Sequence, residues 1–231
     1  MTYEKIKNPA GISQGKKTAL VFAVMMLYAG FSASSYGVNV IFPMKMELMD
    51  AMEYYPLRSA TGTLGMMVAL PLVGKLCDML GTKTVVILGV VFQMVFRVMV
   101  IYADTWQELI VYHAVSSVGL GFYITAPFAI LSDIFEQKDR PKYFGMLIAF
   151  KAIGALTGPL ITGMLMDAGL VNIAFVSYAP FIIAAIPIIL AFYPNIKTER
   201  VKGGKFDFGG VVLVVVGVSC IILFLSLCGQ M

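Results

Sequence analysis

The most informative segment of this chain is Gly74-Lys75-Leu76-Cys77-Asp78-Met79-Leu80-Gly81-Thr82-Lys83. It is a short, charged turn that carries two glycines and lies between two long apolar segments, 57–80 and 84–102. Each segment is close to or above the roughly 20 apolar residues that a helix needs to cross a bilayer. A charged turn this short between two spans predicts a tight hairpin at the membrane surface.

The rest of the chain is as apolar as these two segments. Hydrophobic residues make up 59% of the 231 residues, charged residues 13%, and the mean hydropathy is +0.87. A soluble core cannot bury that much apolar surface, so lipid is the solvent over much of the chain. Strand-like alternation is absent, so we expect an all-α membrane protein, built as a helix bundle. The segments with the composition of spanning helices are 18–43, 57–80, 84–102, 107–131, 143–166, 172–193 and 208–228.

The basic residues predict how these spans are oriented. Most of the 17 Lys and Arg residues fall in the N-terminal tail and in the loops after the second, fourth and sixth spans. Cytoplasmic loops carry an excess of Lys and Arg, so we expect a multi-pass protein of the cell (inner) membrane with a cytoplasmic N-terminus. The expected parts are a cytoplasmic tail 1–17, a six-helix domain 18–193, a cytoplasmic loop 194–207 and a seventh span 208–231.

Composition also argues against several other classes of protein. The net charge of +4 comes from bases beside spans rather than on one face, which indicates membrane topology and not nucleic-acid binding. The three cysteines, at 77, 220 and 228, lack the spacing of a disulfide framework. The sequence contains no metal-ligand cluster, nucleophile–base spacing or phosphate loop. We therefore expect neither an enzyme nor a bound cofactor or metal.

The turn at 74–83 resembles the signature loop between helices 2 and 3 of the major facilitator superfamily, a large family of secondary transporters. The family pattern, Gly-x-Leu-x-Asp-x-x-Gly-Arg-(Arg/Lys), is matched by Gly74, Leu76, Asp78, Gly81 and Lys83. Met79 and Thr82 stand where the family usually has arginine. The resemblance implies that Asp78, with Lys83, holds one conformation of the transport cycle through a helix terminus of the opposite half. The alternative is a surface ion pair of little energetic weight.

The fifth span resembles a second motif of the family, Gly-x-x-x-Gly-Pro-x-x-Gly-Gly, which is associated with antiporters. The matching residues are Gly154, Gly158, Pro159 and Gly163, and Thr162 replaces a glycine. In the family this helix lines the contact between the two six-helix halves. The alternative is ordinary close packing, which small residues allow in any membrane bundle.

The end of the first span, Asn39-Val40-Ile41-Phe42-Pro43, resembles that of drug:proton antiporters with fourteen spans. Ser34 stands where those proteins usually carry an aspartate, and Val115 where they carry an arginine. The stretch Phe206-Asp207-Phe208-Gly209-Gly210 resembles the start of their linker helix. The resemblance implies an N-terminal half plus one helix, so we expect a fragment whose C-terminal half is missing.

The chain also carries a short internal repeat. Gly-x-Leu-x-Asp occurs at Gly74 to Asp78, which ends the second span, and at Gly163 to Asp167, which ends the fifth. These two spans run in opposite directions across the membrane. Such a match predicts a three-plus-three inverted repeat, with a chance match in an apolar chain as the alternative.

Four residues inside the spans are candidates for substrate binding: Lys151, Asn39, Arg97 and Tyr36. Lys151 lies about 12 Å into the fifth span at 1.5 Å per residue. A charge at that depth indicates a functional site, unless the lysine snorkels to the surface. Arg97 is deep in the third span, where a structural role is the alternative. We expect His113, in the fourth span, to be a shallow interfacial residue, with a proton relay as the alternative.

These features predict transport of a small molecule through the lipid bilayer by alternating access, with a coupling ion such as a proton. The rival hypothesis is a non-transporting half-protein that binds a partner. Arg97 and Lys151 lie deep inside the spans, whereas all 13 Asp and Glu residues fall in loops or at span ends. An unpaired intramembrane base attracts anions, so an organic anion such as a carboxylate is the substrate class that we expect.

Overall fold

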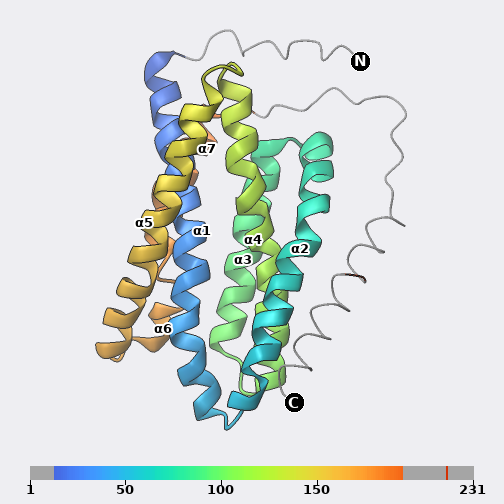
Figure 1. Cartoon of the computed structure of the whole chain (residues 1–231), viewed down its shortest axis with the longest axis vertical. Coiled ribbons are helices and arrows are strands. Elements are labelled where there is room, and N and C mark those ends of the chain that lie inside the picture. Colours follow the sequence, from blue (N-terminus) through green and yellow to red (C-terminus); the bar gives the residue numbers. More distant parts are fainter. Residues whose placement is uncertain (1–12, 195–216, 218–231) are drawn as a thin grey trace.

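The computed structural model describes residues 13–194 and Gly217, and within this range every regular element is a helix (Figure 1). Five segments are long and apolar enough to cross a membrane, and they overlap the first five predicted spans. The seventh predicted span, the tail before residue 13 and the loop after residue 194 lie outside the described residues. The elements are α1 (Gln14–Leu48), η1 (Met52–Tyr54), α2 (Tyr55–Leu80), α3 (Thr82–Ile101), α4 (Trp106–Ile134), α5 (Arg140–Asp167), α6 (Val171–Ala174) and α7 (Ala179–Phe192).

The sixth predicted span, 172–193, is not a single helix, and the prediction is wrong on this point. A short α6 is followed by turns at 175–178 and then by α7, which has 14 residues. Pro180 lies in the first turn of α7. Proline has no backbone N–H and fits the first turn of a helix, so it starts a new helix here and does not continue an old one.

The predicted hairpin at 74–83 is confirmed, and the connection between its two helices is a single residue. α2 ends at Leu80 and α3 begins at Thr82, so Gly81 alone separates them. Gly81 has a φ of +88°, a region that residues with a Cβ adopt only with strain. Its N–H donates to the carbonyl of Cys77 and so closes the end of α2.

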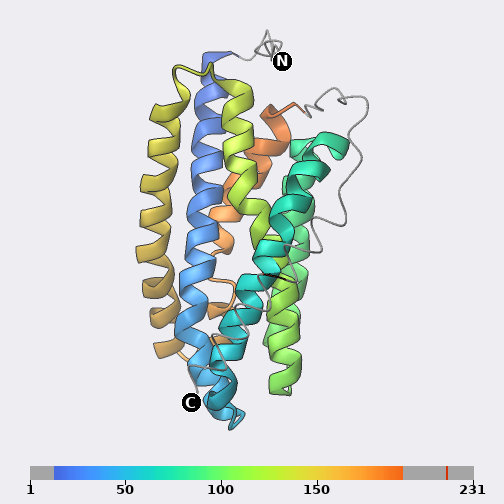
Figure 2. The same ribbon diagram turned by 45° about the vertical axis from the view of Figure 1, so that its right-hand side comes forward.

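The helices pack in an arrangement that supports the inverted repeat. The most extensive contacts pair α1 with α5 and α2 with α4. These two pairs are equivalent if the first three membrane spans and the next three are repeats of one another, because the first span then corresponds to the fourth and the second to the fifth. α2 and α5 run in opposite directions, as Figures 1 and 2 show. Gly65 and Gly154 each lie nine residues before their Gly-x-Leu-x-Asp motif. A Cβ added at Gly154 would lie 2.1 Å from the oxygen of Ala29, and one at Gly65 would lie 2.2 Å from that of Ala114.

α1 is the central helix of the described bundle. It contacts α4, α5 and α7, and it contributes more buried residues to the core than any other described helix. The largest apolar cluster gathers residues of α1, α4 and α7, including Leu27, Ile130 and Ile182. The polar residues of α1 between Phe31 and Asn39 interrupt this apolar core, and a cavity opens beside them.

Candidate functional site

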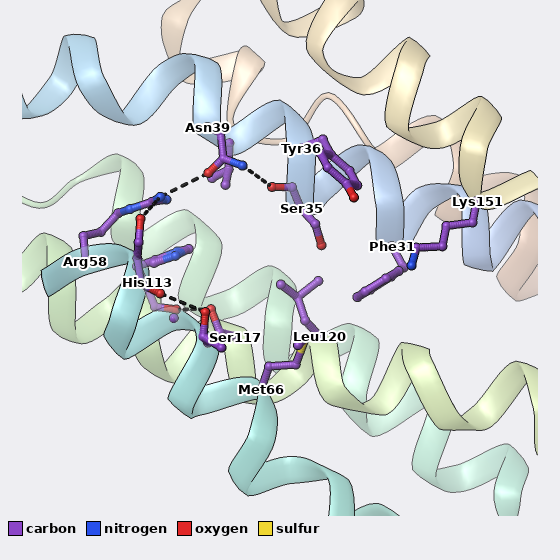
Figure 3. A pocket seen from close by; sticks show the side chains of 14 residues that line it. Phe31, Ser35, Tyr36, Asn39, Arg58, Met66, His113, Ser117, Leu120 and Lys151 are labelled. Atoms are coloured by element: carbon purple, nitrogen blue, oxygen red, sulfur yellow. Dashed lines mark hydrogen bonds between the residues drawn. The ribbon is translucent and has the colours of Figure 1, made fainter. Parts of the chain in front are cut away.

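A cavity of about 360 Å³ lies between α1, α2, α4 and α5. Its lining mixes hydroxyl, amide and basic side chains with apolar ones (Figure 3). The lining residues are Phe31, Ser35, Tyr36, Val38, Asn39, Arg58, Ser59, Gly62, Thr63, Met66, His113, Ser117, Leu120 and Lys151. The volume falls in the range typical of small-molecule sites in proteins.

α1 supplies two of the predicted binding residues to this cavity. Ser35 and Asn39 are one helical turn apart and share a face, and the amide of Asn39 donates to the carbonyl of Ser35 at 3.3 Å. Tyr36 lines the cavity as well, and 47% of its surface remains exposed in this chain. The structure thus brings Asn39 and Tyr36 together, as the sequence predicted, and their role in binding stays a prediction.

Arg58 of α2 forms the end of the cavity opposite Lys151, and sequence reasoning missed it. Its side chain is only 3% exposed. Nη2 donates to Oδ1 of Asn39 at 3.1 Å and to Oγ of Ser59 at 2.9 Å. The guanidinium also lies 4.5 Å from the ring centroid of Phe42, within cation–π range.

The sequence did contain a signal for the position of Arg58. α2 begins at Tyr55 with Pro56 in its first turn. Proline at the first helical position is a typical start signal. That signal places Arg58 inside the helix and not in the loop.

His113 of α4 is buried in the cavity wall, and the expectation of a shallow position in the membrane stays a prediction. Its ring is 5% exposed and lies 4.6 Å from that of Phe42, centroid to centroid. α2 approaches it closely through Gly62, where an added Cβ would lie 2.7 Å from Nε2 of His113. Nδ1 has no hydrogen-bond partner among the described residues.

Lys151 of α5 lines the opposite end of the cavity from Arg58 (Figure 3). It is half-buried and lies in the middle of a 28-residue helix, so the structure places this predicted residue in the lining. Within the part of the chain that the structure describes, the cavity lining contains three basic side chains, of Arg58, His113 and Lys151, and no Asp or Glu. A site with this composition favours ligands that carry negative charge.

A comparison with known protein families decides the identity of this bundle. The family model of the Major Facilitator Superfamily matches residues 20–230, which is nearly the whole chain. The chain belongs to the Major Facilitator Superfamily. The resemblance inferred from the 74–83 turn is therefore confirmed, and so is the expectation of a multi-pass membrane protein with this fold.

Relatives within the superfamily are longer than this chain. Multidrug resistance protein 3 of Bacillus subtilis is 24% identical over 93% of the chain, which spans 42% of that protein. Multidrug transporter protein MdtP of the same organism is 27% identical over 69% of the chain, which covers 29% of it. A crystal structure of the peptide transporter POT with sulfate matches 91% of the chain and 46% of that protein, with a TM-score of 0.63. At 15% identity this match shows the fold alone.

Arg97, a predicted binding residue, is not part of the cavity lining in this Major Facilitator bundle. Its side chain is fully buried, and Nη2 donates to Oγ of Ser34 at 3.1 Å. Gln93 donates to the same oxygen at 3.0 Å. The outer face of α3 carries exposed apolar side chains such as Val95 and Val98, so its polar groups point inward to α1. Ser34 thus joins α1 to α3.

The two superfamily motifs occupy different surroundings in the bundle. Lys83 donates from Nζ to the carbonyl of Leu190 at 2.6 Å and so caps the end of α7. Asp78 lies in the last turn of α2. Gly74 and Gly163 have open space where a Cβ would stand.

The glycines of the fifth-helix motif serve the packing of this half. Gly154 and Gly158 press against Ala29 and Ala33 of α1, where an added Cβ would lie within 2.6 Å of a backbone atom. Pro159 follows them inside α5. Contact of this motif with a second half stays a prediction.

Proposed function

We propose that this chain forms one half of a secondary active transporter, which moves a small molecule across a cell membrane by alternating access. The observation that supports this function is the polar cavity between α1, α2, α4 and α5. In transporters of this architecture, substrate sites lie near the bilayer midplane, where two repeats meet. The lining residues Tyr36 and Asn39 remain exposed, as a wall that faces a second half requires.

A second half completes the cavity in this proposal. The chain spans less than half the length of Multidrug resistance protein 3, and rocking about a central site requires two halves. The multidrug names of two relatives support a small organic molecule as the substrate. The antiporter-like motif at Gly154 to Gly163 supports exchange against a coupling ion such as a proton.

The positions of the bases support a cytoplasmic N-terminus in the cell membrane. The α2–α3 turn and the α4–α5 loop, which carry Lys83 and Lys138, lie at the same end of the bundle as the start of α1 (Figure 1). The positive-inside rule assigns that end to the cytoplasm. The end formed by the α1–α2 connection then faces outward.

The function is tested with a fusion of this chain to the C-terminal half of Multidrug resistance protein 3. The fusion is reconstituted in liposomes under an imposed proton gradient, with a panel of labelled anionic, neutral and cationic solutes. We expect saturable accumulation of at least one solute, reduced by Lys151→Ala and unchanged by Lys138→Ala, since Lys138 is exposed at the surface. The 231-residue chain alone should not accumulate solute.

Two results contradict the proposal. A folded, monodisperse fusion that moves none of the solutes argues for the rival hypothesis of a non-transporting half that binds a partner. Saturable uptake by the 231-residue chain alone would show that it is no half-transporter.

A further inference from the structure

We propose that the cavity binds an organic anion, whose carboxylate contacts Arg58 and whose apolar body lies along Phe31, Met66 and Leu120. This inference deepens the proposed transport function by naming its substrate class, and it rests on that function for the movement of the ligand. Binding of the anion requires only the cavity of this chain, so it is measured separately from transport by the fusion.

The first argument is the incomplete neutralisation of Arg58. A buried guanidinium is costly unless it is paired and hydrogen-bonded. Its partners among the described residues are neutral: the amide of Asn39, the hydroxyls of Ser59 and Tyr55, and the rings of Phe42 and Tyr55. Nε is buried with no hydrogen-bond partner among the described residues. The side chain therefore brings a net charge to the cavity wall, and its buried Nε remains an unpaired donor.

The second argument is the match between guanidinium geometry and a carboxylate. Arginine presents its donors as a planar fork, which suits the two oxygens of a carboxylate better than it suits a single acceptor. Ser59 and Asn39 hold Nη2 from one side, so the orientation of the fork is set before a ligand arrives. Such preorganisation lowers the entropic cost of binding.

The third argument concerns the other basic side chains of the cavity. His113, with its unpartnered Nδ1, lies on the Arg58 side, and Lys151 lies at the far end (Figure 3). No carboxylate lines the described cavity. The charges of Arg58 and Lys151 would repel a cation here, because charges interact strongly in a medium of low dielectric constant. An anion is attracted at both ends.

The apolar residues define the rest of the ligand. Phe31, Met66 and Leu120 lie between Arg58 and Lys151 in the lining (Figure 3). Phe31 and Asn39 are eight residues apart on α1, which corresponds to about 12 Å along the helix. This span leaves room for an apolar or aromatic body next to the carboxylate. The ligand class is thus an amphipathic organic acid and not an inorganic anion.

Binding to the purified 231-residue chain in detergent tests the proposal. The probes are 3-phenylpropionate, its amide and 3-phenylpropylammonium, which share a shape and differ in charge. We expect the carboxylate to bind at least about tenfold more tightly than the amide, because only the carboxylate makes charge-assisted hydrogen bonds. The ammonium should bind more weakly than the amide.

Variants of Arg58 and Lys138 distinguish recognition of the carboxylate by Arg58 from an effect of the protein's net charge. Arg58→Gln should weaken carboxylate binding by about 30-fold or more, since a buried charge pair loses one partner. Arg58→Lys keeps the charge but not the fork, so its loss should be smaller. Lys138→Gln makes the same change in net charge at an exposed site and should leave the affinity unchanged. If Arg58→Gln does not fold, the comparison of Arg58→Lys with Lys138→Gln carries the test.

The outcomes distinguish this proposal from the function on which it rests. Equal or tighter binding of the ammonium overturns it, as does unchanged carboxylate affinity in a folded Arg58 variant. Carboxylate binding with no transport by the fusion leaves it standing and contradicts the transport function. Transport of cations alone by the fusion supports the function and overturns the anion site.

Discussion

Nη2 of Arg58 donates to the amide oxygen of Asn39 at 3.1 Å, and this bond joins α2 to α1 at the wall of the cavity. The pair unites Asn39, a binding candidate named from the sequence, with Arg58, which only the structure brings to the cavity. Because the partner of Arg58 is neutral, the charge of the guanidinium remains available to a ligand.

Asn39→Asp therefore should weaken anion binding more than Asn39→Ala does. The aspartate places a carboxylate at hydrogen-bond distance from Arg58 and competes with the ligand, whereas alanine only removes one acceptor. We expect the aspartate variant to lose about tenfold in affinity for 3-phenylpropionate. Isothermal titration of both variants measures this difference, and equal affinities would argue against a site centred on Arg58.

Gly154→Ala should destabilise the bundle, and Gly163→Ala should not. A Cβ at Gly154 would lie 2.1 Å from the oxygen of Ala29, so α1 and α5 must move apart, at a cost of about 1–3 kcal/mol. Gly163, on the same helix and in the same motif, has open space. Thermal unfolding in detergent compares the two variants. If they unfold alike, close contact through Gly154 does not hold α5 on α1.

Gly65→Ala extends this test to the inverted repeat. Its Cβ would meet the oxygen of Ala114 at 2.2 Å, in the α2–α4 contact that corresponds to α1–α5. We expect a loss of stability similar to that of Gly154→Ala, about 1–3 kcal/mol by the same overpacking. The same unfolding measurement applies. A neutral Gly65→Ala would indicate that the two contacts are not equivalent.

Ser34→Ala should destabilise the protein, while Ser32→Ala is its matched control. Ser34 Oγ accepts hydrogen bonds from Gln93 and Arg97, and Ser32 Oγ is buried with no partner among the described residues. Side-chain hydrogen bonds between membrane helices average about 0.6 kcal/mol each, so two bonds predict a loss of about 1 kcal/mol. Chemical unfolding of both variants measures whether Ser34→Ala loses more stability than Ser32→Ala. A larger loss for Ser32→Ala would be the contrary result.

Asp78→Asn should slow transport by the fusion and leave substrate affinity unchanged. Asp78 belongs to the superfamily motif in the last turn of α2, and the motif implies that it holds one conformation and does not bind substrate. Asp167→Asn, at the corresponding end of α5, is the control and should transport normally. Uptake measured over a range of substrate concentrations gives the turnover rate and the substrate affinity separately. A large loss of affinity with unchanged turnover would contradict the conformational role.

The sequence by itself determined the features that depend on local composition. Five apolar segments fold as the helices it predicts, and the hairpin at 74–83 closes around Gly81 because a positive φ suits glycine. The motif at the same turn was sufficient to indicate the superfamily. Hydropathy and turn chemistry are properties of neighbouring residues, so no tertiary contact is needed to recognise them. The prediction of a single sixth span did not take account of Pro180, which starts a new helix within that span.

Only the tertiary structure decided which polar residues meet at the cavity. Arg58, Lys151 and Arg97 are all bases in apolar surroundings, yet the first two line the cavity and the third lies buried against Ser34. Their sequence neighbourhoods do not distinguish them. Which face of a helix meets a cavity depends on its rotation against other helices, and here small residues set that rotation by allowing close approach. Gly154 on Ala29 and Gly62 on His113 are such contacts, and they join residues far apart in the chain.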